Sequence, residues 1–249
     1  MSVPPIPAQS GPVGRRWHVT GASRGIGHAI AALAAQRGDK VCLVARGLEI
    51  EATAAAIDGD AFGIAADVTR VDDLARVAAA VGERWGGLDV LVNNAGLHKG
   101  GKIESIVDAD WEASLATNLS GPLRAIRALL PLMNEGGSIV NIGAVVGFRG
   151  FPGDGSYGAS KAGLAGLTQV LAAELASKQI RVNMVVPGFV MTEMTSGVSE
   201  RARDKIIARI PLRRLGTAAE IADVCWWVSG ATYMTGSTIF TDGGLMCNL

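Results

Sequence analysis

The sequence predicts an α/β fold in which a doubly wound, seven-stranded parallel sheet carries helices on both faces. Three observations favour it. Short apolar runs alternate with amphipathic stretches from residue 16 to the end of the chain. The run at 40–45 (KVCLVA) is apolar almost throughout, as expected of a strand that is buried on both faces. Regular alternation of strands with helices favours parallel strands joined by right-handed crossovers.

The same pattern predicts the individual strands and helices. The last helix begins with Thr217 and Glu220 in the spacing of a capping box, in which a hydroxyl and a carboxylate satisfy free amides. No repeat or linker interrupts the pattern, so we expect one domain over 15–249, preceded by a flexible segment at 1–14. The expected strands are 17–20, 40–45, 61–65, 90–93, 138–142, 181–186 and 238–241, and the expected helices are 26–37, 71–85, 110–132, 156–178 and 218–228.

Composition excludes several classes of function. Of the 249 residues 49% are hydrophobic, which is enough for a large core, and 23 basic residues balance 23 acidic ones. A neutral chain without a basic cluster argues against nucleic acid or an anionic membrane as the partner. No apolar run reaches the roughly 18 residues of a membrane span, and the first residues do not resemble a signal peptide. The three cysteines are scattered, so we expect a cytoplasmic protein without disulfides or a metal site.

Glycine occupies 33 positions, and three of them lie in the turn after the first strand. The turn reads TGASRGIG over 20–27 and places Gly21, Gly25 and Gly27 between a strand and a helix. Glycines there let the backbone turn sharply and let a pyrophosphate approach the free amides of the helix. An ordinary βα turn is the alternative, but the position after the first strand favours a phosphate site.

Cofactor preference is read at the end of the second strand. An acid there would hold a ribose 2′-hydroxyl, whereas an arginine accommodates a 2′-phosphate. This chain has Arg46 at that position, and Arg24 in the first turn supplies a second guanidinium. The alternative is that these are solvated surface arginines, which is plausible for either residue alone but less so for both together. We therefore expect NADP(H).

Further motifs complete a set that occurs in a known family. Asp67 and Val68 follow the third strand, Asn93-Asn94-Ala95-Gly96 follow the fourth, and YGASK stands at 157–161. With TGASRGIG, Asn118 and a Pro-Gly pair at 187–188, the chain resembles the short-chain dehydrogenase/reductase superfamily over 16–249, and the bacterial 3-oxoacyl-(acyl-carrier-protein) reductases most. The resemblance implies a Rossmann-type fold, oxidoreductase activity and a cofactor site made of Gly21, Ser23, Arg24, Gly25, Ile26, Gly27, Arg46, Asp67, Val68, Asn94, Ala95, Gly96, Tyr157, Lys161, Pro187, Gly188, Val190 and Thr192.

The predicted chemistry centres on Tyr157 and Lys161. At positions i and i+4 of one helix they share a face, so we expect the ammonium to favour the phenolate of a tyrosine whose ordinary pKa is about 10. Tyr157 would then act as general acid when a carbonyl receives hydride, or as base in reverse. The resemblance adds that Lys161 holds the nicotinamide ribose and that Asn118 positions a water of the proton relay.

One position departs from the family pattern. Relatives carry a serine thirteen residues before the tyrosine, and this chain has Ala144 there. Ser138 lies six residues earlier on an extended strand, roughly 20 Å away, and Ser156 points about 100° away from Tyr157 on a helix. Neither replaces the serine. Three interpretations stay open: an engineered knockout, an enzyme with another donor, and a cofactor-binding relative with little activity.

The substrate is open between a 3-oxoacyl thioester on a carrier protein and a small or cyclic ketone. The segments 210–221 and 242–246 favour the first, whereas the acidic Asn134-Glu135 end of the long helix argues against a carrier protein. We expect substrate loops at 148–154 and 191–198. His98 could line the pocket, but we expect a partly exposed loop position for it. The resemblance implies a homotetramer.

Overall fold

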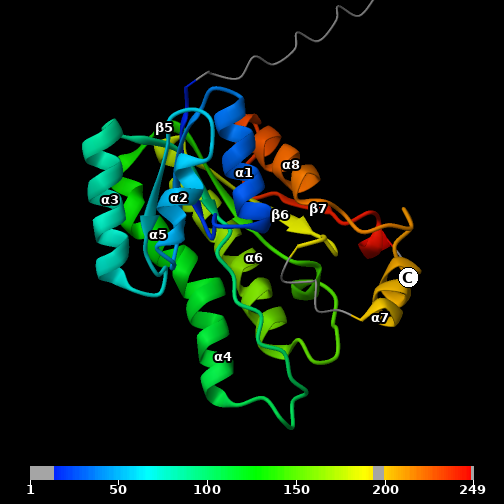
Figure 1. The fold of residues 1–249 in the computed structure, drawn as a ribbon. Coiled ribbons are helices and arrows are strands. Elements are labelled where there is room, and N and C mark those ends of the chain that lie inside the picture. Colours follow the sequence, from blue (N-terminus) through cyan, green and yellow to red (C-terminus); the bar gives the residue numbers. More distant parts are fainter. Residues whose placement is uncertain (1–13, 193–198, 248–249) are drawn as a thin grey trace, which may run out of the picture.

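A parallel sheet forms the middle layer of the protein, and helices cover both of its faces (Figure 1). The computed structural model describes residues 14–192 and 199–247. Within these residues seven strands pair in the order β3-β2-β1-β4-β5-β6-β7, and every pairing is parallel. The predicted doubly wound α/β fold is confirmed. The strands are β1 (Arg16–Thr20), β2 (Lys40–Ala45), β3 (Ala61–Ala65), β4 (Leu88–Asn93), β5 (Met133–Ile142), β6 (Arg181–Pro187) and β7 (Thr238–Thr241).

The helices connect these strands as crossovers. The segment 1–13, for which we predicted flexibility, lies outside the described residues. Among the described helices none is long and apolar enough to cross a membrane. The helices are α1 (Gly25–Gln36), α2 (Glu49–Ala55), α3 (Val71–Trp85), α4 (Asp108–Leu115), α5 (Gly121–Leu129), α6 (Gly155–Leu175), α7 (Glu200–Ile207) and α8 (Ala218–Gly230).

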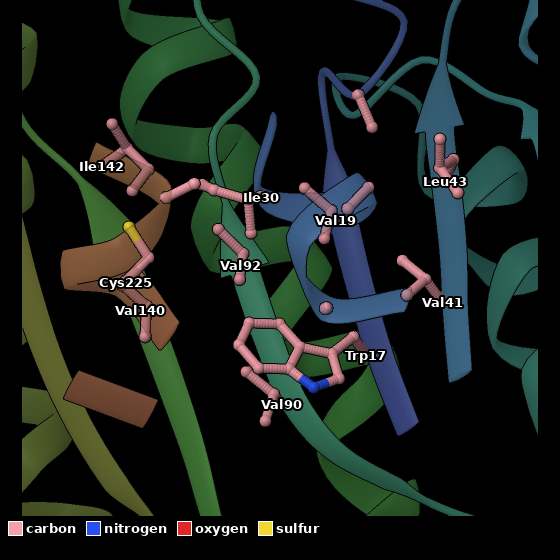
Figure 2. Packing of buried hydrophobic residues seen from close by; sticks show 14 of the residues in the cluster. Trp17, Val19, Ile30, Val41, Leu43, Val90, Val92, Val140, Ile142 and Cys225 are labelled. Carbon is pink, nitrogen blue, oxygen red and sulfur yellow. The ribbon is translucent and has the colours of Figure 1, made fainter. Parts of the chain in front are cut away.

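Successive strand residues face two hydrophobic layers, one on each side of the sheet. Trp17 and Val19 of β1 lie on the side that α1 and α8 cover, and Figure 2 shows them near Ile30 and Cys225 of these helices. The other layer is built on Cys42 and on residues of α3, α5 and α6. A sheet buried on both faces explains why its strands are almost continuously apolar.

The strand order reverses between β1 and β4, which fixes the place of the site. The chain runs from β1 outward to β2 and β3, and then returns to β4 on the other side of β1. Crevices at the carboxyl ends of strands beside such a switch point are where open α/β sheets bind ligands. The turn after β1 and the Asn93–Gly96 segment after β4 both lie at this end.

The helices differ from the prediction in two respects. The single helix expected at 110–132 is divided by a π-helical turn at Ala116–Ser120, where Gly121 N–H donates to the Ala116 carbonyl. Pro122 lacks an N–H and cannot pair with the Asn118 carbonyl, so the regular ladder is interrupted there. Helices α2 and α7 were not predicted, because α2 has only seven residues and α7 has no buried residue to create a period.

The predicted capping box at the start of α8 is confirmed. Glu220 N–H donates to Thr217 Oγ1 over 3.2 Å, and Thr217 N–H donates to Glu220 Oε2 over 2.9 Å.

Candidate active site

A cavity of about 610 Å³ lies at the carboxyl ends of the central strands. It collects segments that follow six different strands, as parallel topology at a switch point requires. Gly27 and Asn118 are buried beside it rather than on its wall. The predicted site residues that line it are Gly21, Ser23, Arg24, Gly25, Ile26, Arg46, Asp67, Val68, Asn94, Ala95, Gly96, Ala144, Tyr157, Lys161, Pro187, Gly188, Val190 and Thr192.

The turn after β1 has the form of an anion cradle. Gly21 and Gly25 adopt φ of +64° and +59°, values that favour glycine, and a Cβ on Gly21 would lie 2.8 Å from the Ala95 backbone. Asn94 Nδ2 donates to the Thr20 and Gly21 carbonyls over 3.0 Å each, which fixes the turn against β4. Among the described side chains none caps the first turn of α1, so its amides suit a pyrophosphate.

Three charged side chains lie on the cavity wall near the ends of β1 and β2. Arg46 and Arg24 are exposed there, as an interaction with a 2′-phosphate would require. Glu49 lines the same cavity, and its carboxylate folds back over Gly47, where a Cβ would collide with it. Sequence reasoning missed this acid, because it follows the strand tip by four residues and begins a helix that was not predicted.

Tyr157 and Lys161 lie side by side on α6 at the cavity wall. Lys161 Nζ is 5.7 Å from the centroid of the Tyr157 ring and donates to the Ile142 carbonyl over 2.8 Å. Burial raises the pKa of Tyr157 to about 12, aided by the charge of Asp154, and burial lowers the pKa of Lys161 to about 8. Burial thus outweighs the expected effect of the Lys161 ammonium, and the pKa of Tyr157 is raised where we expected it to be lowered. The phenol stays protonated at neutral pH, which suits a proton donor.

Asn118 occupies the π-helical turn and holds the loop after β4. Its Oδ1 accepts from Leu97 N–H over 2.7 Å, and its Nδ2 donates to the Leu97 carbonyl over 2.9 Å and to Ser160 Oγ over 3.0 Å. Both amide hydrogens are used by the protein. The side chain thus fixes the cavity wall at Leu97, and its part in a water relay stays a prediction.

Ala144, the position at which the resemblance led us to expect a serine, lines the cavity, and the structure brings neither nearby serine to it. Ser138 is buried in β5, and Ser156 donates from Oγ to the Lys99 carbonyl over 2.9 Å. Neither residue lines the cavity. The structure agrees with the view that neither hydroxyl replaces the serine.

His98 is partly exposed, as expected, but it is held by a specific partner. Its Nε2 lies 2.7 Å from Asp154 Oδ1, and its ring centroid lies 5.1 Å from that of Tyr157. Sequence reasoning could not find this pair, because 56 residues separate its members.

The expected substrate loops are only partly described. Phe151 packs edge-on against Phe189, with ring centroids 5.8 Å apart, whereas residues 193–198 lie outside the described part. In the described ranges no three His, Cys, Asp or Glu side chains gather in a way that could hold a metal ion.

Known proteins are similar to this chain in sequence and in fold over most of its length. A family model described as enoyl-(acyl carrier protein) reductase matches residues 21–246. The 3-oxoacyl-[acyl-carrier-protein] reductase FabG of Staphylococcus epidermidis is 38% identical over 236 residues, which cover 91% of this chain and 97% of the relative. A 3-oxoacyl-[acyl-carrier-protein] reductase of Bos taurus is 39% identical over 234 residues, or 93% of this chain and 98% of that protein.

Solved structures agree with these sequence relatives. A short-chain dehydrogenase/reductase (glucose/ribitol dehydrogenase) from Brucella melitensis superposes with a TM-score of 0.91 at 35% identity, covering 94% of this chain and 98% of that chain. The chain belongs to the short-chain dehydrogenase/reductase family and is a nicotinamide-dependent oxidoreductase acting on CH–OH and C=O groups.

Proposed function

We propose that this chain catalyses the NADPH-dependent reduction of a ketone to a secondary alcohol, with Tyr157 as general acid. The observation that carries the proposal is the shared cavity. Tyr157 and Lys161 line one part of it, and the glycine turn and the two arginines line another. When bound, the nicotinamide cofactor supplies hydride to the carbonyl carbon.

The residues of the chain handle the proton. Tyr157 holds its proton at neutral pH, because burial raises its pKa to about 12, and gives it to the carbonyl oxygen as the alcohol forms. With a pKa of about 8, Lys161 is mostly charged at pH 7 and stabilises the phenolate left behind. In the reverse direction, the same phenolate accepts the proton of the alcohol.

NADPH, rather than NADH, is proposed because of Arg24 and Arg46. Guanidinium groups bind a phosphate through charge-assisted hydrogen bonds, and both side chains are exposed on the cavity wall. The same pocket would hold the adenine beside Asp67 and Val68, and the nicotinamide beside Pro187, Gly188 and Thr192.

Two substrate classes fit the proposal. The names of the relatives support a 3-oxoacyl thioester on a carrier protein. The start of β5 supports a free ketone instead, because Asn134 there donates to Asp89 and the acidic Glu135 follows, so these two positions offer no positive charge to an acidic carrier. The two classes are separated by comparing the turnover of an acetoacetyl thioester carried on acyl carrier protein with the turnover of the same thioester on a small thiol.

The alternative function is that of an NADP(H)-binding relative with little activity, and Ala144 is the observation that favours it. Removing one positioned donor of this kind typically costs 10²–10³ in rate. We expect Ala144→Ser to raise the rate of NADPH oxidation in the presence of ketones at least about tenfold. The panel would contain acetoacetyl thioesters, cyclic ketones and sugars.

Cofactor binding distinguishes the outcomes of this experiment. If both proteins bind NADPH and only Ala144→Ser turns over, the chain is a reductase disabled at one position. If both bind NADPH and neither turns over, the non-catalytic function replaces our proposal. An unchanged rate in an active protein would contradict the assignment of position 144.

A further inference from the structure

We propose that His98, held by Asp154, donates a hydrogen bond to the substrate carbonyl in place of the hydroxyl that Ala144 lacks. This inference rests on the proposed reduction at Tyr157 and adds a catalytic residue to it. The geometry points to it because the imidazole is fixed beside the Tyr157 ring by contacts on both sides.

The loop that carries His98 is anchored before and after it. On the side of β4, Asn118 binds both backbone groups of Leu97, at 2.7 and 2.9 Å. On the other side, Ser156 Oγ donates to the Lys99 carbonyl over 2.9 Å, and Gly101 N–H donates to the Gly153 carbonyl over 2.8 Å. The second set of partners directly precedes Tyr157. The loop is thus attached to the start of α6, and His98 lies between the two anchors.

The imidazole packs against the phenol that gives the proton. The two ring centroids are 5.1 Å apart and the planes meet at 82°, an edge-to-face contact. His98 Nε2 is engaged by Asp154 Oδ1 at 2.7 Å. The Nδ1 atom has no hydrogen-bond partner among the described residues, and 41% of the side chain is exposed. His98 does not itself line the cavity, but it directly follows Leu97 and packs on Tyr157, which both do.

The surrounding charges favour the donor form of His98. The hydrogen bond to Asp154, together with its charge, raises the pKa of His98 above its ordinary value of 6.5, although partial burial opposes this. Lys161 lies across the Tyr157 ring, and Lys99 is paired with Asp110 at 3.5 Å. Tyr157 itself is neutral at pH 7. Once protonated, His98 carries an N–H on both ring nitrogens, and Nδ1–H is the free donor.

The proton balance of the reaction stays that of the proposed function. Hydride from the nicotinamide forms the new C–H bond, and the Tyr157 proton forms the new O–H bond. His98 transfers no proton. It donates a hydrogen bond to the carbonyl oxygen as negative charge develops there, which is the part that a serine hydroxyl plays in relatives. Asp154 is a positioning residue, because it orients and charges the imidazole without touching the substrate.

The test uses the purified full-length protein, NADPH and a small acetoacetyl thioester. His98→Phe retains the ring contact with Tyr157 but removes the donor, and we expect kcat/KM at pH 7 to fall at least about tenfold. Ala144→Ser in the His98→Phe background should recover at least that loss. Its gain should exceed the gain from Ala144→Ser in the original chain, because the two donors serve one oxygen.

The pH profile separates catalysis from structure. Reduction requires the imidazolium, so its rate falls as the pH rises through the pKa of His98. Asp154→Asn should move this fall toward 6.5, and His98→Phe should remove it, leaving only the fall that belongs to Lys161. NMR titration of the imidazole, which needs no turnover, should show the same downward move in Asp154→Asn.

Asp110→Asn is the matched control, since it removes an ion pair of the same loop away from Tyr157. It should leave kcat/KM and the pH profile unchanged. An active protein in which His98→Phe keeps the original kcat/KM and profile would overturn the inference alone. If neither the original chain nor Ala144→Ser turns over while both bind NADPH, the proposed function fails, and the role of His98 with it.

Discussion

We propose that three charged side chains near the ends of β1 and β2 set which cofactor the cavity prefers. Arg24 and Arg46 favour a 2′-phosphate, whereas the Glu49 carboxylate repels it and can accept a hydrogen bond from a ribose 2′-hydroxyl. The preference is therefore a balance between opposite charges. Arg24→Ala with Arg46→Ala should lower the ratio of NADPH to NADH affinity at least about tenfold, since each charge-assisted bond contributes about 1.5–3 kcal/mol.

Glu49→Gln should change the same ratio in the opposite direction, raising it severalfold, because it removes the repulsion and keeps the size of the side chain. Glu51→Gln is the control, since Glu51 is exposed on α2 and does not line the cavity. Fluorescence titration with both nucleotides measures each affinity. A ratio that none of these variants changes would show that the charges at this end do not select the cofactor.

Single residues also show where sequence reasoning stops. The i, i+4 spacing placed Tyr157 and Lys161 together, and the motif placed both arginines at the cavity. The direction of the Tyr157 pKa shift could not be predicted, because burial, which opposes the phenolate, depends on the whole fold. Two other features were missed for a related reason. The Glu49 side chain folds back over Gly47, and His98 and Asp154 are brought together by a contact between residues far apart in the sequence.

Among the elements, β1 carries an unusual buried group. His18 lies in the centre of the sheet between Cys42 of β2 and Leu91 of β4, and neither ring nitrogen has a hydrogen-bond partner among the described residues. Burial lowers the pKa of His18 to about 4. The unfolded chain binds this proton near pH 6.5, so stability is lost as the pH falls from there toward 4.

The strand should therefore make the protein sensitive to acid. At pH 5 the lost stability from His18 amounts to about 2 kcal/mol relative to pH 7. His18→Leu retains a similar volume without a titrating group, and denaturant unfolding at both pH values should show a smaller decrease in its free energy of unfolding. Equal decreases in the two proteins would mean that His18 does not cause the sensitivity.

The elements differ in how well the sequence predicts them. All seven strands were predicted, and in the central ones burial on both faces leaves apolar runs, as in KVCLVA of β2. The 15-residue α3 was predicted because Leu74, Val77 and Val81 form one buried stripe. The π-helical turn at Asn118 was not predicted, because the apolar pattern continues through it and only the hydrogen-bond ladder changes.

At the scale of the whole molecule, parallel topology explains why motifs spread over 20–192 form one site. Each motif follows a strand, and all the strands end on the same side of the sheet. The sequence predicts this much without coordinates. It does not predict which surfaces of the molecule meet other copies, because exposed apolar side chains belong to the same helical patterns as buried ones.

We propose a homotetramer built on two apolar surfaces on opposite faces of the sheet. Val170 on α6 is 53% exposed, and Trp227 on α8 is 49% exposed, although both helices pack their other sides on the core. Two separate self-complementary surfaces are what a tetramer with two kinds of two-fold interface needs.

Each surface can then be disabled separately. Val170→Arg and Trp227→Glu should each leave dimers, because one kind of interface remains, and the double variant should leave monomers. Sedimentation velocity measures the three masses, with Arg201→Glu on the exposed face of α7 as a control that keeps the tetramer. Since α6 carries Tyr157 and Lys161, Val170→Arg should also lower turnover more than Trp227→Glu does. A chain that sediments as a monomer before any substitution would contradict the proposal directly.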